Sequence, residues 1–145
     1  MAGPLPRSVV VVGAGPAGCA AAISLARAGR HVVVVDRARF PRDKICGDGL
    51  TTGALRRLEA LGIDPPTVPS WQPVEDAWIR SPSGFEVRMP LPRHLGTFAA
   101  IAPRVELDAA LVDAARRAGA TVLEGHAVHH VRHDDDGAVV VEADG

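Results

Sequence analysis

The 145-residue sequence has little of what a nucleic-acid-binding protein needs. It contains no tyrosine, three phenylalanines and two tryptophans, too few aromatic side chains for a base-stacking surface. Its 16 Lys and Arg residues against 17 Asp and Glu residues give a formal net charge of −1, with no positive excess for a phosphate backbone. We therefore expect no nucleic acid among its partners.

Cysteines and long apolar runs are also scarce. Cys19 and Cys46 are the two cysteines, which is too few for a disulfide framework and favours a reducing, cytoplasmic setting. The start of the chain imitates a signal peptide, but glycines and a proline interrupt its apolar run. No stretch approaches the roughly 20 apolar residues of a membrane span. We expect a cytoplasmic protein without a transmembrane segment, and contact with a membrane surface stays open.

The first 36 residues predict an α/β fold. Residues 8–12 and 31–35 are β-branched runs, and the alanine-rich residues 16–28 between them favour a helix. Continuous valine runs are typical of parallel strands that are covered on both faces. The length fits one domain. We predict a Rossmann-type fold with a parallel sheet.

The rest of the chain predicts further elements around this core. Residues 51–62 have the leucine spacing of a short amphipathic helix, and residues 106–118 that of a third helix. Residues 74–80 and 85–89 flank the turn-rich "SPSG", so we expect an inserted antiparallel hairpin. The last stretch, "GAVVVEADG", looks like a strand followed by a turn signal, Asp144-Gly145, without a return strand. It predicts that the chain is a fragment of a longer protein.

A glycine-rich motif lies between the first strand and the first helix. Gly13, Gly15 and Gly18 form GxGxxG in "VVVVGAGPAGCAAA". The first glycine permits the tight turn, the second lets a pyrophosphate approach the backbone, and the third allows close packing of helix on strand. The amides of the helix's first turn then meet the phosphate charge. The strand and helix on either side make this a strong signal for a dinucleotide.

An acidic residue stands where a ribose-binding carboxylate is expected. Asp36 closes the second strand, 18 residues after Gly18, and can accept hydrogen bonds from a ribose diol. A carboxylate here disfavours the 2′-phosphate of NADP. FAD and NAD both stay open, because both contain ADP. The alternative is a glycine-rich turn that binds no ligand.

Three segments resemble a known family. "GAGPAG", "VDRARFPRDKICGDGL" and "APRVELDAALVDAARRAGA" are similar to the N-terminal FAD-binding part of flavoproteins of the geranylgeranyl reductase family. This family belongs to the para-hydroxybenzoate hydroxylase-like superfamily of FAD-dependent oxidoreductases and monooxygenases, which includes halogenases. The resemblance covers nearly the whole chain. It implies FAD rather than NAD.

The resemblance also implies which residues contact FAD. The pyrophosphate would lie against the glycine loop, the adenosine against the end of the second strand, and the isoalloxazine against the loop that follows. Arg104 would reach the ribityl or pyrophosphate. The full implied set is Gly13, Gly15, Ala17, Gly18, Asp36, Arg37, Lys44, Gly47, Asp48, Arg104 and Val128.

Several of these residues have alternative interpretations. Cys46 is our candidate for a catalytic thiol, with Lys44 favouring the thiolate. It could instead line the flavin cavity or only pack the loop. Arg104 could form an ion pair at the start of a helix, and Arg42 could be solvated rather than bind an anion. We interpret Cys19 as a core residue.

The histidines near the end of the chain do not predict a metal site. His126 and His130 would share one face of an extended strand, whereas His129 and His133 would share the other. The cluster is therefore split, and we expect no metal.

The implied activity is reduction of isoprenoid carbon-carbon double bonds in a prenyl lipid or quinone, with NAD(P)H as the electron donor. The first alternative is an FAD-dependent monooxygenase or halogenase that acts on an aromatic or polyketide-like metabolite. The second is a non-catalytic, truncated dinucleotide-binding module. We expect residues 1–145 to form one FAD-binding domain, with the substrate domain and later FAD motifs missing, and to be inactive alone.

Overall fold

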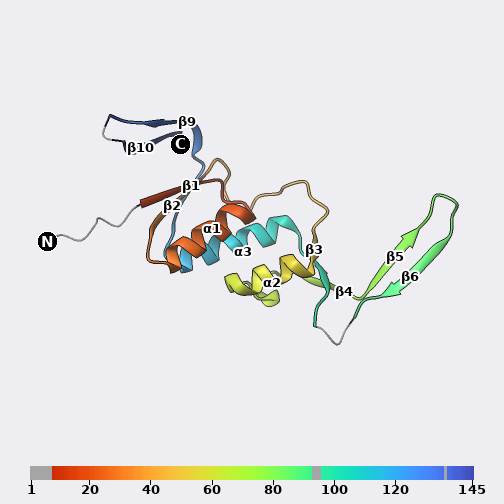
Figure 1. Cartoon of the computed structure of the whole chain (residues 1–145). Coiled ribbons are helices and arrows are strands. Elements are labelled where there is room, and N and C mark those ends of the chain that lie inside the picture. The colour runs from red at the N-terminus through yellow and green to blue at the C-terminus, as the bar shows by residue number, and fades with distance from the viewer. Residues whose placement is uncertain (1–7, 93–95, 136) are drawn as a thin grey trace.

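A three-stranded parallel sheet forms the core of the fold (Figure 1). The computed structural model describes residues 8–92, 96–135 and 137–145. β1 (Ser8–Val12) pairs with β2 (His31–Asp36), and β2 pairs with β8 (Thr121–Glu124), both in parallel. α1 (Pro16–Arg27) connects β1 to β2. The predicted strand, helix, strand order and the parallel sheet are confirmed.

Two helices pack together over one face of this sheet. α3 (Arg104–Arg117) lies beside α1 (Figure 1). The side chains of Ile23, Val32, Leu111 and Val112 are fully buried in the core that these helices form with the sheet. The other face differs from the prediction, because Val12 is 57% exposed and Leu123 41% exposed. The valine-rich strands are therefore not covered equally on both faces in the described part of the chain.

A second sheet lies between β2 and α3 in the sequence. β3 (Gly49–Thr51) and β4 (Gln72–Val74) both pair antiparallel with β7 (Ala99–Ile101). α2 (Thr52–Leu61), the predicted second helix, follows β3 directly, and the short 3-10 helix η1 (Pro65–Thr67) comes next. This sheet brings the chain back to the start of α3, where the Ala102 amide donates to the Asp48 carbonyl over 2.9 Å.

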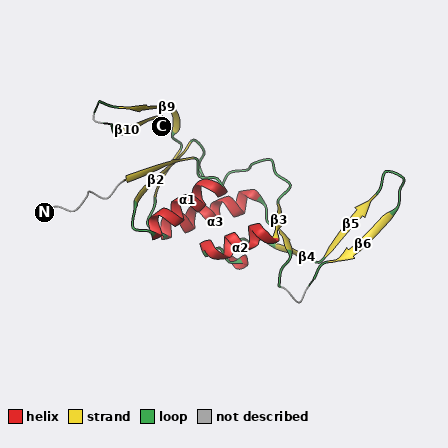
Figure 2. Ribbon diagram, in the orientation of Figure 1, coloured by secondary structure: helices red, strands yellow, loops and turns green. Residues whose placement is uncertain are grey.

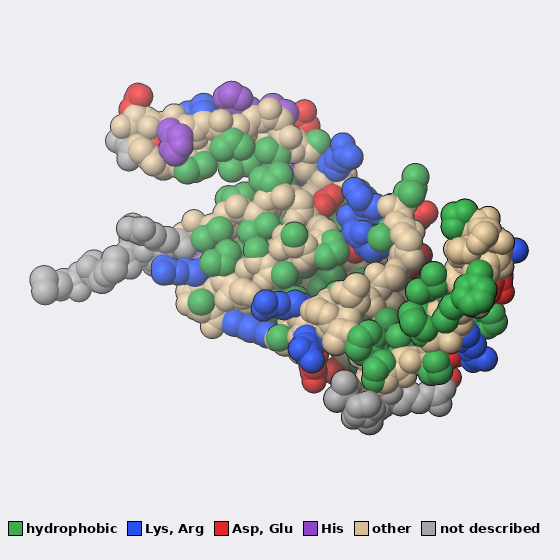
Figure 3. All heavy atoms as spheres, turned by 45° about the vertical axis from the view of Figure 1, so that its right-hand side comes forward, with side chains coloured by type: hydrophobic (Ala, Val, Ile, Leu, Met, Phe, Trp, Pro, Cys, Tyr) green, Lys and Arg blue, Asp and Glu red, His purple; other side chains and the backbone are tan. Residues whose placement is uncertain are grey.

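The inserted hairpin projects from this second sheet (Figures 1 and 2). β5 (Asp76–Arg80) pairs antiparallel with β6 (Glu86–Pro90), which confirms the predicted hairpin. Its two faces differ, because residues alternate across a strand. One face carries Ala77, Ile79, Val87 and Met89; the other carries Trp78 and the ion pairs Arg80–Glu86 and Arg88–Asp76. Exposed apolar side chains gather on this hairpin (Figure 3).

The chain ends in another hairpin, formed by β9 (Ala127–His133) and β10 (Val139–Asp144). The interpretation of Asp144-Gly145 as a turn was wrong, because Asp144 belongs to β10 and pairs with Ala127. His129 lies 3.6 Å from the Asp144 carboxylate. Across residues 8–92, 96–135 and 137–145, no group of three or more His, Cys, Asp or Glu side chains could hold a metal ion. Within the same ranges, none of the helices combines the length and the apolar character that a membrane span requires.

Candidate functional site

A cleft of about 1120 Å³ opens at the carboxyl ends of β1 and β2, where α1 begins. Segments far apart in the sequence form its wall: the glycine loop, the end of β2, the loop after it, the start of α3 and the start of β9. Nine residues of the predicted set line it: Gly13, Gly15, Ala17, Gly18, Asp36, Arg37, Lys44, Arg104 and Val128. Gly47, Asp48 and the candidate thiol of Cys46 are not among its lining residues.

The glycine loop has the geometry that a dinucleotide needs. Gly13 adopts φ +98° and its amide donates to the Val35 carbonyl over 2.8 Å. A Cβ on Gly18 would lie 1.8 Å from the Gly13 carbonyl oxygen, so only glycine allows this approach of α1 to the loop. Gly15 is the N-cap of α1, without a side-chain cap, and faces the cleft. The first amides of the helix are therefore directed toward the site where an anion would bind.

Asp36 connects the end of β2 to the glycine loop. One carboxylate oxygen accepts a hydrogen bond from the Ala14 amide at 2.6 Å, and the other accepts from the Ala38 amide at 2.8 Å. Each carboxylate oxygen can accept a second hydrogen bond. The side chain can thus hold the loop and still receive a ribose hydroxyl. The sequence had predicted only the second of these roles.

Arg37 and Val128 lie beside this end of the cleft. The His126 amide donates to the Asp36 carbonyl over 2.9 Å, which brings residues 126–128 next to the end of β2. Arg37 is exposed there. The resemblance implied that the adenosine would lie at this end of the second strand.

Arg104 forms the ion pair that was one of its two predicted roles, and contact with FAD stays a prediction. It starts α3 and forms a forked ion pair with Asp108, with its Nε 2.7 Å from Oδ1 and its Nη2 2.9 Å from Oδ2. It also lines the cleft. The hydrogen bonds to Asp108 raise the pKa of Arg104 above its usual value. Asp108 was missed in the sequence, although its spacing of four residues from Arg104 on a helix was a usable signal.

The two cysteines differ in burial and in the pKa of the thiol. Burial raises the pKa of the Cys19 thiol to about 12, and its Sγ donates to the Ala14 carbonyl at 3.2 Å, as expected of a core residue. Cys46 is exposed, and the pKa of its thiol is lowered by a hydrogen bond from the Asp48 amide and another from Arg104. Lys44, which we had expected to favour the thiolate, is not among the groups that lower it.

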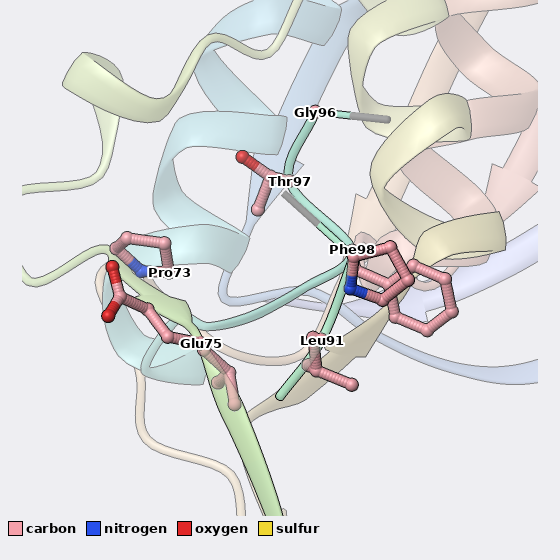
Figure 4. A pocket seen from close by; sticks show the side chains of 8 residues that line it. Pro73, Glu75, Leu91, Gly96, Thr97 and Phe98 are labelled. Atoms are coloured by element: carbon pink, nitrogen blue, oxygen red, sulfur yellow. The ribbon is translucent and has the colours of Figure 1, made fainter. Parts of the chain in front are cut away.

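A smaller cavity of about 270 Å³ lies at the base of the projecting hairpin (Figure 4). Its described lining residues include Pro73, Leu91, Thr97 and Phe98, and Glu75 is the ionisable one among them. It shares no described lining residue with the glycine-loop cleft. The cleft therefore remains the candidate functional site.

The parallel sheet, the glycine loop and the acidic end of β2 define a dinucleotide-binding domain of the Rossmann type. Residues 7–145 match the family model described as FAD binding domain, and the chain belongs to this family. The predicted resemblance to FAD-dependent oxidoreductases is thereby confirmed, and FAD is the dinucleotide that the family supports.

Relatives agree with this assignment. The chain is 48% identical over 139 residues to the menaquinone reductase of Mycolicibacterium smegmatis, a match over 90% of this chain and 32% of that protein. The chain thus spans about a third of the length of this relative. Among solved structures, the flavin-dependent halogenase CmlS is 28% identical with a TM-score of 0.75, over 94% of this chain and 26% of that one. A geranylgeranyl bacteriochlorophyll reductase-like protein from Thermoplasma acidophilum shares the fold, with a TM-score of 0.75 at 23% identity over 92% of this chain and 36% of that one.

Proposed function

We propose that residues 1–145 are the FAD-binding domain of a flavin-dependent oxidoreductase that reduces an isoprenoid carbon-carbon double bond of a prenyl lipid or quinone. One observation carries the cofactor assignment. The glycine loop, Asp36 and Arg104 line a single cleft in a chain that belongs to the FAD binding domain family. NAD(P)H is the proposed electron donor.

The proposed residue roles follow the lining of the cleft, except for Cys46, Gly47 and Asp48, which lie outside it. The glycine loop with Ala17 and the first amides of α1 would bind the pyrophosphate, and Asp36 the adenosine ribose. Arg37 and Val128 would flank the adenine. Lys44, Gly47 and Asp48 would form the isoalloxazine end, with Cys46 as the candidate thiol. When bound, FAD supplies the two-electron chemistry of hydride transfer.

The quinone substrate class is supported by sequence similarity. The Mycolicibacterium smegmatis protein that is 48% identical to this chain is named menaquinone reductase, and a menaquinone is a quinone with a prenyl tail. Because the chain spans about a third of that protein, we propose that the substrate-binding part lies in a longer protein. A prenyl quinone lies in membranes, so we further propose a cytoplasmic protein that works at a membrane surface.

The second candidate is a monooxygenase or halogenase that uses reduced flavin and O₂. It is supported by the similarity to CmlS, a flavin-dependent halogenase that is 28% identical over 94% of this chain. In either case we expect residues 1–145 alone to have no catalytic activity.

A product analysis separates these candidates. A protein of the relatives' length that contains these residues is incubated without oxygen with a prenyl quinone and NADH or NADPH. The product is then reoxidised in air, and its molecular mass is measured by mass spectrometry. A lasting gain of two hydrogen atoms supports double-bond reduction, because a merely reduced quinone ring returns to its original mass. An unchanged mass contradicts the proposal, and an added oxygen or halogen in a parallel aerobic reaction favours the second candidate.

A further inference from the structure

We propose that Asp108 is a positioning residue that holds the guanidinium groups of Arg42 and Arg104 at the wall of the cleft, where they face the anionic pyrophosphate of the dinucleotide. This inference rests on the proposed function, since it takes the cleft to be the FAD site. Asp108 itself is not a lining residue of the cleft and would act only through the two arginines.

The first observation is the burial of the carboxylate. The Asp108 side chain has no exposed surface, although it carries a charge. Burying a carboxylate is costly unless its charge is paired and hydrogen-bonded. Arg104 provides a forked pair, with contacts of 2.7 and 2.9 Å, and the Nη2 of Arg42 lies 3.2 Å from Oδ2. Both oxygens of one buried group thus contact guanidinium groups from two separate segments.

The second observation is where the two guanidinium groups lie. Both arginines line the cleft and are mostly buried, at 19% exposed for Arg42 and 17% for Arg104. The Nη2 of Arg42 is 3.8 Å from the position that a Cβ on Gly15 would occupy, so this group lies against the glycine loop. The centroid of the Phe40 ring lies 5.1 Å from the Arg42 guanidinium carbon, a cation–π contact. Arg42 is thus held between a carboxylate, an aromatic ring and the loop.

The third observation is the balance of charge. Within this group of three side chains, two guanidinium groups share one carboxylate, so one positive charge stays in excess even though Asp108 neutralises the other. An arginine has five N–H donors, and Asp108 uses only some of them. A free arginine would lose rotamer freedom when it binds an anion, whereas an arginine already fixed by Asp108 loses less. Asp108 would therefore increase the affinity for a diphosphate without contacting it.

A purely structural role is the alternative, because Asp108 also joins the loop after β2 to α3. The two roles differ in one respect. A structural residue changes the free energy of unfolding, while a positioning residue changes the affinity of the folded protein for FAD and does so through Arg42 and Arg104.

The test is a double-mutant cycle with Asp108→Asn and Arg42→Gln. Asp113→Asn is the matched control, since Asp113 lies on the same helix, is 60% exposed and pairs with Arg116. FAD affinity is measured by amide NMR titration at a temperature where every variant is folded, as checked by thermal unfolding. In the chain without added ligand, exchange of the Arg104 Nε proton is followed in parallel.

We expect Asp108→Asn to weaken FAD binding by about tenfold or more, because both arginines lose the charge-assisted hydrogen bonds that fix their side chains. In the Arg42→Gln background the same substitution should weaken FAD binding by a clearly smaller factor. Asp113→Asn should change the affinity for FAD by less than about twofold. Asp108→Glu, which keeps the charge but moves the carboxylate by one methylene, is the second variant and should weaken binding with the fold retained. The Arg104 Nε proton should exchange faster in Asp108→Asn.

Three results would overturn the inference. The first is an Asp108→Asn variant that melts at a lower temperature but binds FAD as tightly as Asp113→Asn does. The second is an Asp108→Asn substitution that weakens FAD binding by the same factor with Arg42 and with Gln at position 42. The third is an Arg104 Nε proton that exchanges at the same rate with and without the Asp108 carboxylate. If the unsubstituted chain bound no FAD, the proposed function would fail separately, and the exchange measurement would still decide whether Asp108 positions Arg104.

Discussion

The Asp36 carboxylate accepts a 2.6 Å hydrogen bond from the backbone amide of Ala14. This contact fastens the end of β2 to the middle of the glycine loop, across 22 residues of sequence. A second hydrogen bond, 2.8 Å long, fastens the same side chain to the Ala38 amide. Asp36 therefore shapes the site as well as offering an acceptor to a ribose.

Replacing Asp36 with Ala should destabilise the chain in the absence of any nucleotide. Two amides lose a charged, mostly buried acceptor, so the free energy of unfolding should fall by about 1.5–3 kcal/mol. Urea unfolding followed by circular dichroism measures this. If the midpoint does not move, the two amide contacts do not contribute to stability, and the effect of Asp36 is confined to ligand binding.

Gly15 and Gly18 should respond differently to the same substitution. Gly18→Ala places a Cβ 1.8 Å from the Gly13 carbonyl oxygen, so we expect a loss of more than about 4 kcal/mol or an insoluble protein. Gly15→Ala meets only the Arg42 Nη2 at 3.8 Å, an ordinary contact, and should change stability by less than about 1 kcal/mol. Gly15→Ala should nevertheless weaken FAD binding, because its Cβ enters the cleft. Equal stability of both variants would show that the packing of α1 on the loop is looser than the structure has it.

The thiol of Cys46 should react at lower pH than an ordinary cysteine. Its pKa is lowered from 9.0 by hydrogen bonds from the Asp48 amide and Arg104, so the reactive thiolate persists below pH 9 and is lost only as pH falls through the lowered pKa. The rate of iodoacetamide labelling against pH should therefore have its midpoint below 9.0. In Arg104→Gln this midpoint should rise. Cys46→Ser is the control and should label slowly, because Cys19 is buried and its pKa is about 12. A wild-type midpoint at 9 or above would contradict the account of this loop.

A substitution in the core should change the free energy of unfolding about ten times as much as one on the projecting hairpin. Leu111 is a fully buried residue of α3, so Leu111→Ala should lower the free energy of unfolding by about 2–5 kcal/mol. Ile79 on the projecting hairpin is 54% exposed, and Ile79→Thr should change stability by less than about 0.5 kcal/mol. Thermal or urea unfolding of the two variants checks this. A large effect of Ile79→Thr would mean that the apolar face of the hairpin is covered in solution.

The sequence was most informative where structure depends on neighbours in the chain. The GxGxxG spacing, the valine runs and the turn-rich "SPSG" predicted the loop, the sheet and the hairpin, because each is a local pattern. The interpretation of Asp144-Gly145 as a turn was wrong because it used a local pattern alone. Asp-Gly is a common turn pair, but the pairing of Asp144 with Ala127 decides its structure, and this pairing is not local.

The ion-pair network around Asp108 could not be read from the sequence in full. Its pairing with Arg104 follows helical spacing, yet its contact with Arg42 exists only because the loop after β2 folds back onto α3. The same long-range folding brings Arg104 rather than Lys44 to Cys46. Contacts between distant segments, more than residue types, were what the sequence left undetermined.

The most direct test of the cofactor assignment is an NMR titration of this chain with FAD, NAD and NADP in turn, because amide shifts also detect weak binding. We predict that FAD binds more tightly than NAD, that NADP binds least, and that the amides of Gly13, Gly15 and Arg37 shift with FAD. Tighter binding of NAD than of FAD, or no shift in the glycine loop at saturating FAD, would contradict the account.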